Sequence, residues 1–99
     1  MKSRRAKACD ISNAVKDRVW ARDKEMCIIC WNANAMPNAH FIRRSKGGLG
    51  IEQNVVTLCQ RCHNEFDNGV NASYYADKIE RYLQKKYKDW NKEDLFYKK

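Results

Sequence analysis

Two pairs of cysteines constrain the fold of this 99-residue chain more than any other feature. Cys27 and Cys30 form one CxxC motif, and Cys59 and Cys62 form a second. A two-residue spacer lets both sulfurs of a motif turn toward one ion, so the two motifs can supply four thiolates to a single tetrahedral Zn²⁺. In a reducing compartment this spacing is typical of metal binding rather than of disulfides. We therefore predict one structural zinc site, with Cys9 left as a free or half-buried thiol.

Charge and composition bound the partners and the location. The chain carries 20 Lys and Arg against 12 Asp and Glu, a net charge of +8, and its pI is near 9.4. A basic protein of this kind favours a polyanion as partner. There is no apolar run of about 18 residues to span a membrane, and the basic start is followed by no apolar signal segment. We expect a cytoplasmic protein without a membrane partner.

Composition divides the chain into three parts. Residues 1–11 are basic and predict a flexible arm. Residues 12–70 contain both cysteine pairs and predict the core of a single small domain. Residues 71–99 are rich in helix formers and aromatic residues, which predict a helical tail packed on that core.

Local signals predict the individual elements. Ser12 is a suitable N-cap for a helix over 13–22, in which Val15, Val19 and Trp20 recur at helical spacing and should face the core. The β-branched run 55–58 predicts a strand. The other expected elements are a polar loop over 32–38, a strand over 40–42, a glycine-rich loop over 46–50, a helix over 62–68 and a tail helix over 73–87.

The interval between the two cysteine pairs is unusually long. It contains 28 residues, whereas roughly 15 to 20 usually separate paired zinc knuckles. The insert holds His40 and, after a glycine-rich stretch, Asn54, and the second pair leads directly into His63. This order resembles the HNH nuclease family, in which a histidine ends a first strand, an asparagine opens a second and a histidine starts a helix after a cysteine knuckle. The resemblance covers roughly residues 12–70 and looks greatest to small phage or prophage members.

The resemblance implies an α+β fold, with a small ββα-metal core on a four-cysteine, zinc-ribbon-like scaffold between an N-terminal helix and a C-terminal helical tail. It also implies roles for three residues. His40 would be the general base that activates water, because a neutral imidazole has suitable basicity near pH 7. His63 would hold a catalytic divalent ion, Mg²⁺ or Mn²⁺. Asn54 would brace the strand that carries the base.

The chain departs from the family pattern immediately before the predicted base. Many members carry an aspartate or a second histidine there as a metal ligand, whereas this chain has Ala39, which cannot bind metal. Asp67 is the candidate replacement, because a residue four positions after His63 shares a helix face with it. An exposed carboxylate near a helix end is an equally good interpretation of Asp67.

Basic residues follow the predicted base. Arg43, Arg44 and Lys46 lie in a glycine-rich stretch, where they are candidates for phosphate contacts that give affinity without base selection. A solvated charged loop is the alternative interpretation.

These features together predict a metal-dependent DNA endonuclease that hydrolyses phosphodiester bonds, either by nicking or by cutting both strands. The resemblance to phage members implies a protein that works in a bacterial host cell beside the packaging terminase. Two alternatives stay open because of Ala39: a zinc-ribbon DNA-binding module that has lost catalysis, and an adaptor that docks on a larger nuclease.

Overall fold

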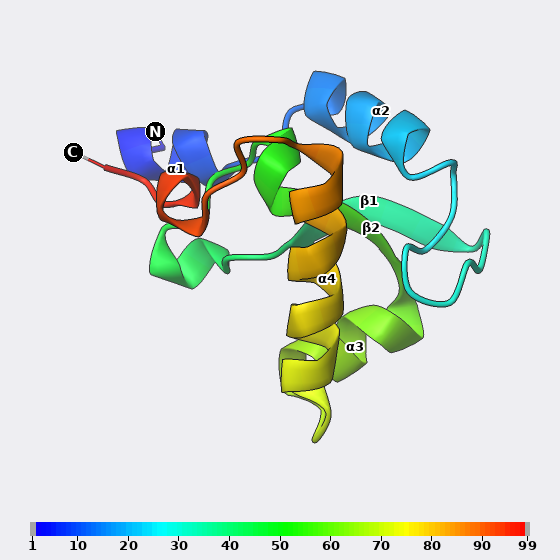
Figure 1. Cartoon of the computed structure of the whole chain (residues 1–99). Helices are drawn as coiled ribbons and strands as arrows, with labels where there is room; N and C mark the ends of the chain where they lie inside the picture. Colours follow the sequence, from blue (N-terminus) through cyan, green and yellow to red (C-terminus); the bar gives the residue numbers. More distant parts are fainter. Residues whose placement is uncertain (1, 99) are drawn as a thin grey trace.

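Helices surround a two-stranded antiparallel sheet in the computed structural model, which describes residues 2–98 (Figure 1). Two helices precede the sheet and two follow it, which confirms the predicted α+β class. Within the described residues, no helix is both long enough and apolar enough to cross a membrane. The elements are α1 (Arg4–Cys9), α2 (Asn13–Arg22), β1 (Ala35–His40), β2 (Val55–Cys59), α3 (Gln60–Asn68) and α4 (Ala72–Lys86), with 3₁₀ turns η1 (Arg44–Lys46), η2 (Glu52–Asn54) and η3 (Lys92–Leu95).

Helix α2 forms where its cap and its apolar stripe predict it. The Oγ of Ser12 accepts a hydrogen bond from the Val15 N–H at 3.1 Å, which satisfies one of the unpaired donors of the first turn. Val15 and Val19 are buried against Val55 of β2. The apolar face of α2 thus packs on the sheet.

Strand β1 lies earlier in the chain than predicted. The sequence suggests a loop over 32–38 and a strand over 40–42, but β1 spans Ala35–His40 and pairs antiparallel with β2. The ladder ends after His40 because Asn54 accepts hydrogen bonds from the N–H groups of the next two residues, at 2.7 and 2.8 Å. Pro37, which favoured a loop, sits where the register of the ladder is irregular. Proline is tolerated at such a position because no donor is needed there.

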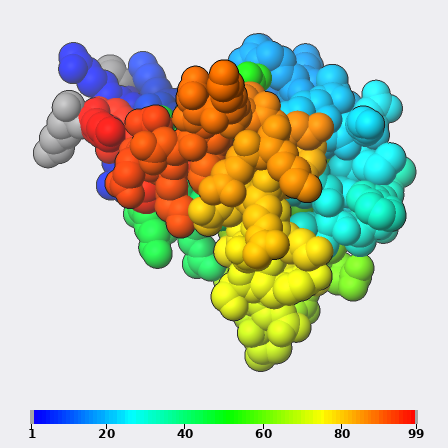
Figure 2. All heavy atoms as spheres, viewed as in Figure 1, coloured from blue at the N-terminus to red at the C-terminus, as the bar shows by residue number. Residues whose placement is uncertain are grey.

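The main hydrophobic core lies between the sheet and the C-terminal elements. Ile79 and Leu83 of α4 are fully buried, as is Leu95 of η3, and they pack with Leu58 and Phe66. The space-filling view shows α4 and the segment after it, coloured yellow to red, spread across one face of the molecule (Figure 2). The C-terminal elements therefore complete the core instead of projecting from it.

The N-terminal segment is not a free arm. The sequence predicts flexibility over 1–11, yet Arg4–Cys9 form α1, capped by the Ser3 Oγ, and the Cys9 side chain is buried. The Gly50 N–H donates to the Ala8 carbonyl at 3.0 Å. Because Gly50 has no Cβ, this segment can lie directly against the glycine-rich loop. Contact with the glycine-rich loop thus adds to the Ser3 cap in holding the segment in place.

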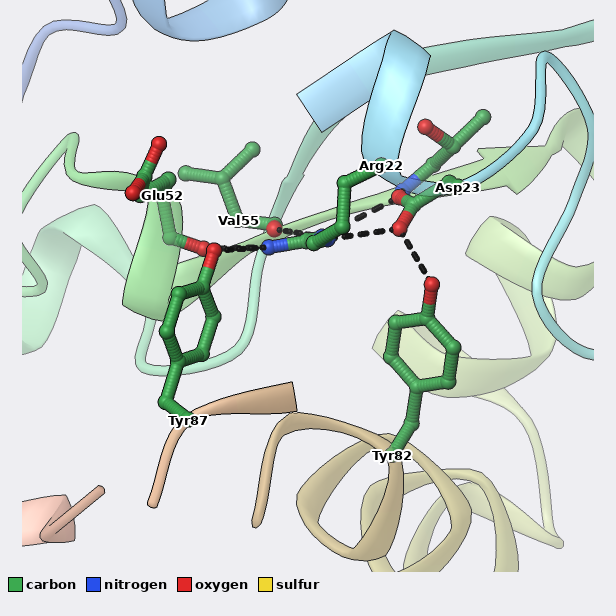
Figure 3. Close-up of polar contacts among 7 residues, drawn as sticks. Arg22, Asp23, Glu52, Val55, Tyr82 and Tyr87 are labelled. Carbon is green, nitrogen blue, oxygen red and sulfur yellow. Dashed lines mark hydrogen bonds and ion pairs between the residues drawn. The ribbon is translucent and has the colours of Figure 1, made fainter. Parts of the chain in front are cut away.

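A buried ion pair joins α2, β2 and α4 beside the core (Figure 3). The Arg22 Nε donates to the Asp23 Oδ1 at 2.7 Å, and Tyr82 of α4 donates to the same oxygen at 2.6 Å. Burial and this bond to Asp23 raise the pKa of Tyr82. Buried charges stabilise a fold only when their hydrogen bonds are satisfied. Here the other contacts of the pair are to the Glu52 and Val55 carbonyls, the Tyr87 hydroxyl and the Thr57 N–H.

Candidate active site and metal centre

The four cysteines of the two CxxC motifs meet at one point. The Sγ atoms of Cys27, Cys30, Cys59 and Cys62 all lie within 4.8 Å of one another, and those of Cys30 and Cys59 are 3.5 Å apart. Thiolates bound to one Zn²⁺ at about 2.3 Å stand about 3.8 Å apart in a tetrahedron. All four cysteines are free of disulfides. The donor set and its size therefore fit a structural zinc ion.

The electrostatics of this cluster also favour a cation. Burial raises the pKa of Cys62, and the neighbouring thiols raise it further. Burial opposes ionisation of Cys30 as well, but hydrogen bonds from the Asn32 backbone and the other cysteines lower the pKa of Cys30 to about 7. Ionisation of one thiol therefore makes ionisation of a neighbouring thiol less favourable. A bound metal ion removes this competition, because it stabilises all four thiolates together.

A second group of polar residues lines a depression of about 370 Å³ between β1, η1 and α3. It contains both histidines of the chain, His40 and His63. Of the other residues predicted to act, the structure brings Asp67, Arg43 and Arg44 into the same depression, whereas Lys46 does not line it. Three further residues line the depression without having been candidates from the sequence, namely Asn38, Ser45 and Asn68.

A larger hollow elsewhere carries different chemistry. It measures about 540 Å³, lies between η2 and the C-terminal segment, and is lined by residues such as Tyr87 and Trp90. Its lining includes neither histidine nor cysteine. The smaller depression is therefore the candidate active site.

His40 ends β1 with its ring held by the N-terminal segment. The Nε2 of His40 lies 2.9 Å from the Cys9 carbonyl oxygen. Because a carbonyl only accepts hydrogen bonds, Nε2 carries the proton in the neutral ring and the Nδ1 keeps its lone pair. Burial lowers the pKa of His40 despite the Cys9 bond, and the charge of Arg44 lowers it further. Nothing in the sequence signals the Cys9 contact, since 31 positions separate the two residues.

His63 and Asp67 stand one turn apart on α3. The His63 Nε2 and the Asp67 Oδ2 are 3.3 Å apart, and the two side chains are 29% and 41% exposed. Positions i and i+4 of a helix share a face. The two side chains therefore converge at the edge of the depression, where an imidazole nitrogen and a carboxylate oxygen can reach one divalent ion.

Asn54 is buried beneath the loop between the strands. Its Oδ1 accepts from the Ile42 N–H at 2.8 Å, and its Nδ2 donates to the Leu49 carbonyl at 2.8 Å and to the Ile42 carbonyl at 3.2 Å. The residue is fully inaccessible. Asn54 thus ties the glycine-rich loop, through Leu49, to the segment that follows β1, and it does not itself line the depression.

Two arginines of the depression have protein partners. The Arg43 Nη2 donates to the Asp67 carbonyl at 2.7 Å, and the Arg44 Nη1 donates to the Asp10 Oδ1 at 2.6 Å. Hydrogen bonds from Lys2 and Arg44 lower the pKa of Asp10. Both arginines are exposed, and the Arg44 side chain is 48% exposed. A guanidinium group has five N–H donors, so each arginine keeps donors for a further partner.

Comparison with known proteins finds one family model that matches the central segment of the chain. Residues 27–69 match the family model described as HNH endonuclease. The chain is also similar to the protein named Anaredoxin from Nostoc sp. (strain PCC 7120 / SAG 25.82 / UTEX 2576), with 41% identity over 44 residues. That alignment covers 43% of this chain and 58% of the relative. No solved structure matches. The family match confirms the resemblance drawn from the sequence over residues 27–69, which make up less than half of the chain.

Proposed function

We propose that the protein is a metal-dependent DNA endonuclease in which His40 is the general base. The observation that carries the proposal is the contact between the His40 Nε2 and the Cys9 carbonyl. This contact leaves the Nδ1 as the basic atom, on a ring that lines the same depression as His63 and Asp67. The lowered pKa of His40 keeps the ring neutral, and thus basic, at pH 7.

In the proposed reaction, the His40 Nδ1 removes a proton from a water molecule that attacks the scissile phosphate. The ring becomes an imidazolium, and its bond to the Cys9 carbonyl becomes a stronger, charge-assisted hydrogen bond. The carbonyl also holds the ring in place, which matters because a misplacement of about 1 Å can lower a rate about a hundredfold. Cleavage breaks the bond between phosphorus and the leaving oxygen.

His63 and Asp67 would hold Mg²⁺ or Mn²⁺, with the carboxylate as the ligand type that such ions prefer and the imidazole nitrogen as a second ligand. A divalent ion, when bound, stabilises the charge that develops on the phosphate and the leaving oxygen. Arg43 and Arg44 flank the depression and would contact phosphates on either side. Asn54 acts indirectly, because its three hydrogen bonds fix the loop that follows His40.

The HNH match supports the nuclease family and DNA as the substrate. A role beside a phage terminase and a cytoplasmic location stay predictions from the sequence alone. The chain spans only 58% of the relative that it matches. The name of that relative does not state whether it is a nuclease.

Cleavage of supercoiled plasmid tests the proposal. The purified, zinc-loaded protein is incubated with plasmid in Mg²⁺, Mn²⁺ or EDTA, beside the variants His40→Ala and Asn64→Ala. Asn64 is exposed on α3 and outside the depression, so it serves as a matched control. We expect metal-dependent nicking or linearisation that His40→Ala lowers by about 10² to 10⁴ and Asn64→Ala leaves unchanged.

The main alternative is a DNA-binding module without catalysis, and burial of Ala39 favours it. Ala39 is fully inaccessible in the main core, so its position offers the depression no ligand. This alternative predicts plasmid that is bound but intact in every metal, with one zinc per chain. That outcome would contradict the proposed nuclease.

A further inference from the structure

An irregularity in β1 lies beside the candidate active site. Met36 pairs with Leu58 and Ala39 pairs with Val56, so three steps along β1 face two along β2. The extra residue falls at Pro37 or Asn38. Such bulges re-aim the side chains of the strand that contains them and are frequent next to active sites.

Just after the bulge, the neighbouring side chains of Ala39 and His40 point to opposite sides of β1. Ala39 is fully buried in the main core, whereas His40 lines the depression. Asn38, two residues before His40, lines the depression as well. Successive residues of a strand face opposite sides, so Asn38 and His40 share the side that Ala39 does not. The position immediately before the base thus belongs to the core in this chain.

The surroundings of Asn38 suit a cation ligand. Asn38 is only partly exposed, and none of the side-chain hydrogen bonds among residues 2–98 involves its amide. The depression that it lines also contains His63 and Asp67, which come from α3 on the other side. An asparagine amide oxygen is a ligand that hard divalent cations accept, together with carboxylates and water.

We propose that the Asn38 amide oxygen supplies the metal ligand that Ala39 lacks, so that Asn38, His63 and Asp67 together bind Mn²⁺ or Mg²⁺. The proposal rests on the proposed function, because it concerns the ion of the same site. The proposed ligand thus stands two residues before the base, next to the bulge, instead of immediately before the base.

Direct binding of Mn²⁺ tests the proposal without DNA. Manganese is titrated into the zinc-loaded full chain, and free Mn²⁺ is measured by electron paramagnetic resonance. Zinc already occupies the four thiolates, and Mn²⁺ prefers oxygen ligands. We expect Asn38→Ala to weaken Mn²⁺ binding by about tenfold. Asn38→Asp should tighten it by about tenfold, since added ligand charge strengthens binding.

Asn64 provides the matched controls. It lies next to His63 but outside the depression, and its Oδ1 accepts from the Gln60 side chain. Asn64→Ala should leave Mn²⁺ binding unchanged, and Asn64→Asp should change it by less than about twofold, as an exposed charge does. Circular dichroism and zinc content verify that each variant is folded.

Three results would overturn the proposal. These are wild-type affinity for Mn²⁺ in Asn38→Ala, equal tightening by Asn38→Asp and Asn64→Asp, and no Mn²⁺ binding by the wild type. A variant Asn38→Ala that keeps its Mn²⁺ affinity but binds DNA more weakly in EDTA would make Asn38 a phosphate contact instead.

Plasmid cleavage is measured in parallel. If the wild type binds Mn²⁺ through Asn38 but cuts no DNA, the proposed function fails and the metal site stands. If Asn38→Ala keeps both cleavage and Mn²⁺ affinity, only the metal site fails.

Discussion

Replacing Gly50 by alanine tests whether the N-terminal segment positions the base. A Cβ at residue 50 would lie 2.0 Å from the Asp10 carbonyl oxygen and 2.9 Å from the Cys9 carbonyl oxygen. Both are backbone atoms, so no side-chain rotation relieves the overlap. To reach ordinary contact near 3.4 Å, the Asp10 carbonyl has to move by about 1.4 Å. The segment that carries the acceptor of His40 must therefore shift.

The expected losses of stability and of cleavage rate follow from the hydrogen bonds that this shift disturbs. The bond between the His40 Nε2 and the Cys9 carbonyl is 2.9 Å long, and a displacement of about 1 Å takes it beyond hydrogen-bond range. The bond from the Gly50 N–H to the Ala8 carbonyl is lost with it. At about 1 kcal/mol for each bond, we expect Gly50→Ala to lower the free energy of unfolding by about 2 kcal/mol. Loss of the group that orients the base should lower the cleavage rate by about 10- to 100-fold.

Gly47→Ala is the matched control in the same loop. Gly47 has φ +84°, and the nearest atom to its Cβ would be 3.6 Å away on a flexible arginine. The substitution should cost about 1 kcal/mol of stability through its backbone conformation while leaving His40 in place. The two glycines thus separate backbone strain from displacement of the N-terminal segment.

Two assays on these variants test whether the Cys9 carbonyl orients His40. Single-turnover plasmid cleavage gives the rate, and long-range ¹H–¹⁵N spectra of the imidazole give the tautomer of His40. We expect one tautomer, protonated at Nε2, in the wild type and Gly47→Ala, and a mixture in Gly50→Ala. A folded Gly50→Ala protein with the wild-type tautomer and rate would refute the role of the Cys9 carbonyl.

Three further predictions concern stability, metal and pH. Asn54→Ala should lower the free energy of unfolding in urea by about 3 kcal/mol, because three buried bonds are lost; a loss below about 1 kcal/mol would contradict the bracing role. Cys59→Ser, or a strong zinc chelator, should release the metal and unfold the chain, seen by circular dichroism with zinc analysis, whereas Cys9→Ser should keep its zinc. Since the pKa of His40 lies below its ordinary 6.5, cleavage should be lost only as the pH falls through that lower value. A half-maximal rate above pH 7 would exclude His40 as the titrating base.

Local sequence signals predicted much of the fold. The Ser12 cap and the stripe of Val15 and Val19 place α2 at its observed bounds. The strand expected over 55–58 and the tail helix expected over 73–87 agree with β2 and α4 to within one residue at each end. These elements depend on caps, β-branched runs and helical periodicity, all of which act between residues close in sequence.

The first strand was predicted too late in the chain, and for the same reason Asn38 was not recognised as a site residue. Pro37 and the polar residues around it are typical of a loop, and only pairing with β2 makes 35–40 a strand. With the strand placed too late, the side shared by Asn38 and His40 could not be identified. The order of α1 was missed in the same way, because its contacts with the glycine-rich loop come from about 40 positions further along the chain.

The sequence by itself determined which atoms are available: four thiols at zinc spacing, two histidines and a glycine-rich loop with its asparagine. Ligand chemistry and motif spacing are local properties, so they are legible without coordinates. Only the tertiary structure decided that the Cys9 carbonyl holds His40, that Ala39 belongs to the core and that Asn38 lines the site. These contacts join distant segments through packing and backbone hydrogen bonds, which no residue type specifies alone.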